Sequence, residues 1–196
     1  RTVGWITQLV VDTSERRQSI ATVLLQRLKA SGLFDSVTVV GLASSHPAAC
    51  AALAKLAGAC ISIVDTGFIA ENARNVLSST TVDYLKSAKL HGSLFGGDFV
   101  PGTVSLVFTN FYVDHDEPLA ALREVCEHRT WCLGDLLEGH EFICMAPMQA
   151  PSLVAPTVPL GGGDVIPVGT RHVHFQGCLC FVIAFLLVLL LCYAET

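Results

Sequence analysis

The sequence predicts an α/β fold with a mixed α+β sheet, because strand-like and helix-like segments alternate along its first third. Trp5 to Val11 is rich in β-branched and apolar residues over the length of a strand. From Ile20 to Ser31 the apolar residues recur at helical spacing, and Gly32 is a typical helix stop. Val37 to Leu42 is short and almost entirely apolar, which is typical of a strand that is buried on both faces.

A second helix and a third strand complete the predicted α/β unit. Pro47 suits the first turn of a helix, and either Ser45 or His46 can cap it. This alanine-rich helix stops at Gly58, and the third predicted strand is Cys60 to Val64. A strand–helix–strand–helix–strand order is typical of α/β folds.

Over the next eighty residues, the sequence predicts further helices and strands. We expect helices at Phe68 to Leu77 and at Leu119 to about Glu127, and strands at Val104 to Val113 and at Glu141 to Met145. Asp116 lies in an acidic turn, where it is better explained as a helix cap than as a metal ligand. No metal is therefore predicted, and the domain is expected to span residues 1–145.

The composition changes after residue 145. Five prolines and three consecutive glycines predict a linker over residues 146–177. Residues 178–194 are an uncharged apolar run of seventeen residues, which predicts a C-terminal hydrophobic helix. At 1.5 Å per residue it would span about 25 Å, so we expect a candidate transmembrane tail. Two alternatives remain open: a tail that is not native, and a helix buried in the protein.

The length, net charge and cysteine pattern of the chain limit the classes of function that we expect. The 196 residues suffice for one domain, and the formal net charge of −5 argues against a general nucleic-acid binder. The eight cysteines show no CxxC pair, which predicts reduced thiols in an intracellular, cytoplasmic protein or in one that its tail anchors to a membrane. Because the chain begins at Arg1, almost directly in a strand, we expect a fragment or a processed chain.

The junction between the first strand and the first helix is a candidate anion site. Backbone N–H groups and the positive end of the helix dipole point outward at such a junction. Arg16 and Arg17 lie beside it and add positive charge that suits a phosphate group.

This junction resembles the pyrophosphate loop of the GCN5-related N-acetyltransferase (GNAT) family, whose pattern is Gln/Arg-x-x-Gly-x-Gly/Ala. Residues 16–21 lie on the pattern in register, with Ser19 in place of the first glycine. The resemblance covers residues 3–64 and implies a partial GNAT-like acyl-CoA N-acyltransferase fold that lacks the N-terminal strands of the family. It also implies that strand backbone holds the pantetheine arm and that the loop holds the pyrophosphate of acetyl-CoA. The implied cofactor-binding residues are Leu9, Val10, Val11, Arg16, Arg17, Gln18, Ser19, Ile20 and Ala21.

The resemblance continues into the second helix with two polar positions lost. In the family pattern Asn-x-x-Ala-x-x-Leu-Tyr-x-Lys-x-Gly, His46 falls at the Asn position and Leu53 at the Tyr position. Ala49 and Lys55 keep their positions, and Gly58 lies one residue late. The resemblance implies that His46 lies near the cofactor. The family tyrosine often reprotonates the coenzyme A thiolate, and a leucine has no proton to give.

The resemblance implies an acetyl-CoA-dependent N-acetyltransferase that acts on an unknown amine and is truncated or weakly active. The chain offers no carboxylate between Thr2 and Val11 as a base, and Tyr84 and Tyr112 are better explained as half-buried aromatic residues than as the acid. We therefore assign no catalytic residue. Two other functions stay open: an inactive CoA-binding or interaction module, and a tail-anchored membrane protein without enzymatic activity.

Overall fold

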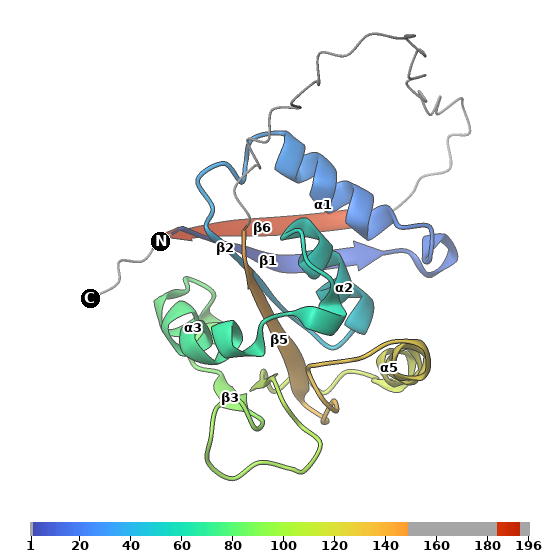
Figure 1. Cartoon of the computed structure of the whole chain (residues 1–196), viewed down its shortest axis with the longest axis vertical. Coiled ribbons are helices and arrows are strands. Elements are labelled where there is room, and N and C mark those ends of the chain that lie inside the picture. The colour runs from blue at the N-terminus through green and yellow to red at the C-terminus, as the bar shows by residue number, and fades with distance from the viewer. Residues whose placement is uncertain (1, 149–183, 193–196) are drawn as a thin grey trace, which may run out of the picture.

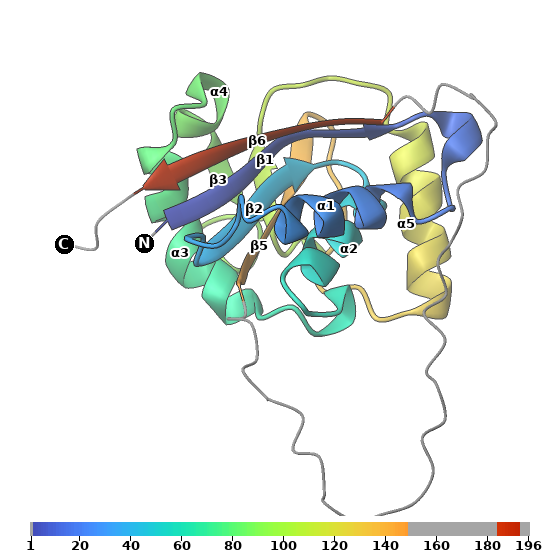
Figure 2. The same ribbon diagram turned by 90° about the horizontal axis from the view of Figure 1, so that it is seen from above.

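The computed structural model describes residues 2–148 and the backbone of residues 184–192. Six strands form one mixed sheet in the order β3-β4-β5-β2-β1-β6, with helices against both faces (Figures 1 and 2). The strands are β1 (Thr2–Val11), β2 (Val39–Ser44), β3 (Lys89–His91), β4 (Leu106–Phe108), β5 (His140–Pro147) and β6 (Ala184–Cys192). The helices are α1 (Ile20–Ala30), α2 (Pro47–Leu56), α3 (Thr66–Ser79), α4 (Asp83–Lys86) and α5 (Asp116–His128), with 3₁₀ turns η1 (Thr13–Glu15) and η2 (Ile61–Ile63). The predicted α/β class with a mixed sheet is confirmed.

The centre of the sheet is a parallel pair of strands joined by a helical crossover. β1 and β2 pair from Val3 opposite Val39 to Ile6 opposite Leu42, and α1 connects them. Parallel strands need a crossover of this kind, which the sequence order predicted. β5 pairs antiparallel with the other edge of β2, so that β2 is buried on both sides as expected.

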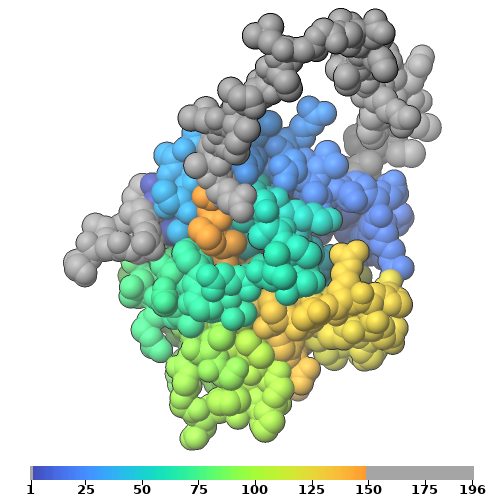
Figure 3. Space-filling model, viewed as in Figure 1, coloured from blue at the N-terminus to red at the C-terminus, as the bar shows by residue number. Residues whose placement is uncertain are grey.

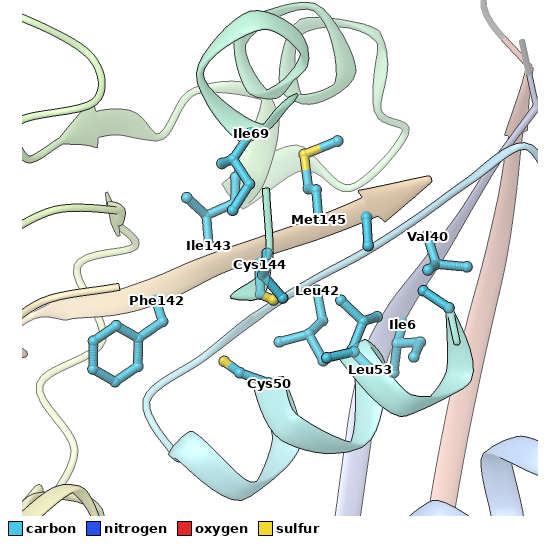
Figure 4. Packing of buried hydrophobic residues seen from close by; sticks show 14 of the residues in the cluster. Ile6, Val40, Leu42, Cys50, Leu53, Ile69, Phe142, Ile143, Cys144 and Met145 are labelled. Carbon is cyan, nitrogen blue, oxygen red and sulfur yellow. The ribbon is translucent and has the colours of Figure 1, made fainter. Parts of the chain in front are cut away.

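Helices cover both faces of the central strands. α1 and α2 pack beside each other (Figures 1 and 2). Figure 4 shows Cys50 and Leu53 of α2 beside Leu42 on one face, and Ile69 of α3 beside Ile143 on the other. All five side chains are fully or almost fully buried. The alternating strand side chains thus supply both halves of the core.

The parallel pair carries one tight contact between a tryptophan and a glycine. Trp5 is 1% exposed, and its indole lies across the backbone of Gly41 on the neighbouring strand. A Cβ atom at Gly41 would overlap the indole ring and lie 3.2 Å from Met145 Cγ. Gly41 therefore gives the ring the space that it occupies in the core.

The second predicted helix has the expected ends. The side chain of His46 accepts a hydrogen bond from the N–H of Ala48, and Pro47 occupies the first helical position. Gly32 and Gly58, the predicted stops after α1 and α2, both have a φ of 84°. In α5 the cap differs from the prediction: Asp114, and not Asp116, accepts a hydrogen bond, which the Asp116 N–H donates over 2.8 Å.

The predicted third strand, Cys60 to Val64, is wrong. Ile61–Ile63 form the 3₁₀ turn η2, in which the Ile63 N–H bonds to Cys60 O and the Val64 N–H to Ile61 O. A five-residue apolar run has no periodicity that separates a strand from a turn. The edge of β2 that this strand would have taken pairs with β5 instead.

The predicted strand from Val104 to Val113 is shorter in the structure. β4 ends at Phe108, and Asn110 has a φ of 61°, which an extended strand does not allow. Phe111 and Val113 are exposed beyond it. The apolar pattern therefore continued past the point where the chain leaves the sheet.

The predicted C-terminal hydrophobic helix is also wrong where the structure describes it. Residues 184–192 form β6, which pairs antiparallel with β1 from Thr2 opposite Cys192 to Val11 opposite Ala184. A continuous apolar run suits either a helix or a strand. The open edge of β1 offers a ladder of N–H and C=O groups, which favours the strand. No helix in the described part of the chain combines the length and apolarity needed to cross a membrane.

The predicted linker begins slightly too early. Ala146 and Pro147 still belong to β5, and the N–H of Met148 donates to Thr38 O over 2.9 Å. Residues 149–177 of the predicted linker and residues 178–183 of the predicted tail lie outside the described residues.

Replacing Gly41 with alanine is expected to destabilise the protein by about 1–3 kcal/mol, because the new methyl group overpacks the core against the Trp5 ring. Urea unfolding of the full chain measures this change. Trp5→Leu removes the ring, so the cost of Gly41→Ala should fall by more than half in that background. If Gly41→Ala lowers the free energy of unfolding equally with and without the Trp5 ring, the contact with that ring is not the cause of the destabilisation.

Candidate functional site

The loop between β1 and α1 turns sharply and exposes its backbone. Asp12 begins η1 by accepting a hydrogen bond from the Ser14 N–H. Arg17 and Ser19 then have φ values of 65° and 62°, in the left-handed region that non-glycine residues rarely occupy. Ser19 is the position at which the GNAT pattern carries its first glycine. This loop therefore has the backbone conformation that a glycine adopts most easily, although the residue is a serine.

The start of α1 presents hydrogen-bond donors. The first intrahelical bond runs from the Val23 N–H to Ser19 O at 2.9 Å, and the Ser19 side chain makes no capping bond. Within residues 2–148, the N–H groups of Ile20, Ala21 and Thr22 have no hydrogen-bond partner. Gln18 and Ser19 are exposed beside them, and Ile20, Ala21 and Thr22 are partly exposed, so no element within residues 2–148 buries this turn.

The two arginines of the loop contact carboxylates of α5. The Arg16 Nε–H donates to Val11 O at 3.0 Å, and the Arg16 guanidinium forms an ion pair with Glu117. Arg17 Nη2 lies 2.6 Å from Glu124 Oε2, although 81% of the Arg17 side chain is exposed. Figure 2 shows α5 next to this loop, and the two segments adjoin in the space-filling view (Figure 3). The positive charges of Arg16 and Arg17 are therefore partly neutralised by carboxylates of the protein itself.

Beside the loop, β1 and β2 separate. Their parallel ladder ends at Ile6 and Leu42, while β1 continues to Val11 and β2 to Ser44. The register of β1 against β6 shifts between Ile6 and Gln8, so the strand is irregular at the point of separation. Beyond Ile6, no residue of β2 pairs with β1. Residues 9–11 thus extend beyond the β1–β2 ladder, and on this stretch the Val11 carbonyl already accepts the Arg16 Nε–H.

His46, the N-cap of α2, has a defined tautomer. Its Nδ1 accepts the Ala48 N–H at 3.1 Å, so the proton of the neutral ring is on Nε2. Nε2 lies 3.8 Å from Glu117 Oε1, the carboxylate that also pairs with Arg16. Burial, and secondarily the charge of Arg16, lower the pKa of His46. The ring is therefore a neutral donor through Nε2 and not a free base.

The three positions considered for a proton-donating acid, and not assigned that role, lie apart from this cluster. Leu53 is fully buried in the core. Tyr84 is half-buried on α4, its ring 5.1 Å from Phe111, and burial and Glu141 raise its pKa. Tyr112 is 64% exposed in the segment after β4. No contact in the described residues links either tyrosine to the β1–α1 loop.

Sequence reasoning missed three carboxylates. Glu117 and Glu124 lie about one hundred residues after the arginines that they contact. The acidic first turn of α5 was the only sequence signal for Glu117, and Glu124 had none. Glu141 on β5 is partly buried, and this burial raises its pKa. Nothing in its sequence surroundings distinguished it from an ordinary strand residue.

Comparison of the chain with protein-family models, with curated proteins and with solved structures found no match. The functional argument therefore depends on the residues of the site.

Ser19→Gly is expected to stabilise the folded protein by about 0.5–1 kcal/mol, because glycine relieves the cost of a left-handed φ. Ser19→Ala keeps that cost and should leave stability equal or lower. Urea unfolding of both variants checks the prediction. If glycine and alanine have the same effect, then the loop is not strained at this position.

The stability of the protein should rise with pH between the lowered pKa of His46 and its ordinary value near 6.5. In this interval the unfolded state binds the His46 proton and the folded state does not, so lowering the pH favours unfolding. His46→Asn keeps a capping side chain but does not titrate, and should flatten this part of the profile. Urea unfolding between pH 5 and 7 measures both slopes, and identical slopes would contradict the assignment.

Proposed function

We propose that the protein binds acetyl-CoA or a related acyl-CoA at the β1–α1 loop and transfers the acyl group to an amine. The observation that carries the proposal is the exposed start of α1, where the N–H groups of Ile20, Ala21 and Thr22 follow a left-handed Ser19. Helix N-termini with free N–H groups bind phosphates through hydrogen bonds and through the helix dipole. The resemblance of residues 16–21 to the GNAT pyrophosphate loop supports an acyl-CoA as the ligand class.

The opening between β1 and β2 suits the pantetheine arm. This arm is extended and carries two amide groups, which can form hydrogen bonds with an unpaired strand edge. Leu9, Val10 and Val11 lie on β1 beyond the end of the β1–β2 ladder, although the Val11 carbonyl already accepts the Arg16 Nε–H, which a ligand would have to displace there. The diphosphate at the helix start and the acyl end between the strands would then lie along one line of backbone donors and acceptors.

His46 would contribute as a hydrogen-bond donor. Its Nδ1 is occupied by the Ala48 N–H, so the Nε2–H is the group that remains for a ligand. In a bound complex this N–H would donate to a cofactor oxygen in place of the amide of the family asparagine. The ring stays neutral near pH 7 because burial lowers its pKa.

The carboxylates of α5 would compete with the diphosphate. Glu124 contacts the guanidinium of Arg17, and Glu117 contacts that of Arg16. Binding a diphosphate would exchange a carboxylate for a phosphate at each arginine, so the net gain from the arginines is smaller than for unpaired side chains. The affinity would therefore depend mainly on the backbone donors.

Transfer requires that the amine nitrogen form a bond to the thioester carbonyl carbon while the carbon–sulfur bond breaks. The amine loses a proton, and the departing thiolate gains one. Leu53 is buried and has no proton to give, which favours the second candidate function, a CoA-binding module without catalysis. The two candidates share the binding site and differ only in turnover.

Calorimetric titration of the full chain with acetyl-CoA should show micromolar or weaker binding. Arg16→Ala/Arg17→Ala should weaken this binding about tenfold, or ~1.4 kcal/mol, because two guanidinium contacts to phosphate are lost. Arg27→Ala/Arg129→Ala removes two exposed positive charges elsewhere and serves as the matched control. Absence of binding at millimolar acetyl-CoA, with the protein folded, would overturn the proposal.

Glu124→Gln should tighten acetyl-CoA binding about threefold, because it frees Arg17 for the phosphate. Glu127→Gln removes a nearby exposed carboxylate of α5 that makes no ion pair within the described chain, and should change affinity less. Equal changes in both variants would indicate only a general loss of negative charge.

A separate assay distinguishes a transferase from a binding module. It detects the free thiol of coenzyme A that acyl transfer to a panel of amines would release.

A further inference from the structure

A groove opens at the edge of the sheet opposite β6. It lies between α3, the end of α4, β3 and the loop at residues 96–98, with a cavity volume of about 450 Å³. α3 and β3 are neighbours in Figure 1, and β4, β5 and β2 separate β3 from β1. The groove is therefore distinct from the β1–α1 loop.

Basic side chains from three elements meet in this groove. Arg74 comes from α3, Lys86 from the end of α4, and Lys89 and His91 from β3, whereas Asp98 is the one carboxylate of the lining. In residues 2–148, no ion pair involves Arg74, Lys86 or Lys89. Glu71 lies three residues before Arg74, and Asp83 lies three residues before Lys86. Within residues 2–148, neither carboxylate forms an ion pair with that neighbour.

This concentration of positive charge is unusual for the chain. The whole sequence carries only 12 lysines and arginines and a net charge of −5. Like charges that share a groove raise the electrostatic free energy of the unliganded protein. A bound anion lowers it, most strongly when the anion carries two charges.

The rim of the groove adds backbone donors. Gly96 and Gly97 have φ values of 70° and 77°, and nothing lies within 4 Å of a Cβ atom placed on either. Their N–H groups make no hydrogen bond in the described part of the chain. Such bare peptide groups can approach the oxygens of an anion closely.

Apolar groups line another part of the wall. Leu77, Ala88 and Leu90 contribute to the lining, and Leu77 is buried where it meets the core. The cavity also exceeds the size of an inorganic phosphate ion by several fold. Its lining therefore suits a ligand that joins an anionic head to a small apolar body.

We propose that this groove binds a small organic phosphate monoester, with the phosphate dianion among Arg74, Lys86 and Lys89 and the organic part against Leu77 and Leu90. The proposal does not depend on coenzyme A binding, because it concerns a different edge of the sheet.

His91 provides a reporter inside the groove. Its ring lies 4.9 Å from the ring of His140, and burial, with His140 and Lys89, lowers its pKa. A dianion bound beside it favours the protonated ring. Ligand should therefore shift the His91 titration to higher pH.

Phenyl phosphate titrated into the full chain, followed by NMR of the histidine ring protons and by calorimetry, tests the proposal. We expect saturable binding, an upward shift of the His91 pKa, and affinity at least threefold above that of inorganic phosphate. Lys86→Gln/Lys89→Gln should weaken binding at least fivefold, whereas the matched Arg27→Gln/Arg129→Gln should change it less than twofold.

Equal weakening by the groove variant and the matched control would overturn the proposal, and so would binding that leaves His91 unshifted. Arg16→Ala/Arg17→Ala should leave phenyl phosphate binding unchanged. If this variant abolishes it instead, the phosphate binds at the β1–α1 loop and the groove assignment fails, while the proposed coenzyme A site does not.

Discussion

The structure depends on the parallel pairing of β1 with β2 over four residues and on its end at Ile6 and Leu42. Over the paired part, the two strands carry the core: Trp5 packs across Gly41, and helices cover both faces. Beyond it, β1 runs on without β2, and its backbone becomes available along one edge. The same strand therefore stabilises the fold at one end and leads into the candidate site, the β1–α1 loop, at the other.

Local chemistry explains which parts of the fold the sequence could predict. α2 was predictable because Pro47 and His46 fix its start and Gly58 its end through interactions within a few residues. The segments Cys60 to Val64 and 184–192 were not, because apolar runs without periodicity leave the choice to tertiary contacts. In the first case β5 takes the edge of β2, and in the second β1 offers an unpaired edge. Both errors concern strand partners that lie far away in the sequence.

The candidate site divides in the same way. The position of the loop and the start of α1 follow from about ten consecutive residues, whereas the left-handed φ of Ser19 is not one that a serine predicts. The carboxylates of Glu117 and Glu124 come from α5, about one hundred residues later, and no local pattern indicates that they meet Arg16 and Arg17. A motif specifies the backbone of an anion site, but the charge around that site depends on the packing of distant elements.

The ion pairs of α5 also bear on how such a site can exist without a ligand. Two adjacent guanidinium groups beside a helix N-terminus repel each other and the positive end of the dipole. Carboxylates from α5 relieve that repulsion, and because both pairs are partly exposed, each contributes little stability. In the proposed complex, exchanging them for a diphosphate would therefore cost little, while the N–H groups of Ile20, Ala21 and Thr22, which have no partner within residues 2–148, would gain one. Under the proposal the backbone of the loop would then determine the affinity, and α5 would determine how much of the arginine charge a ligand could use.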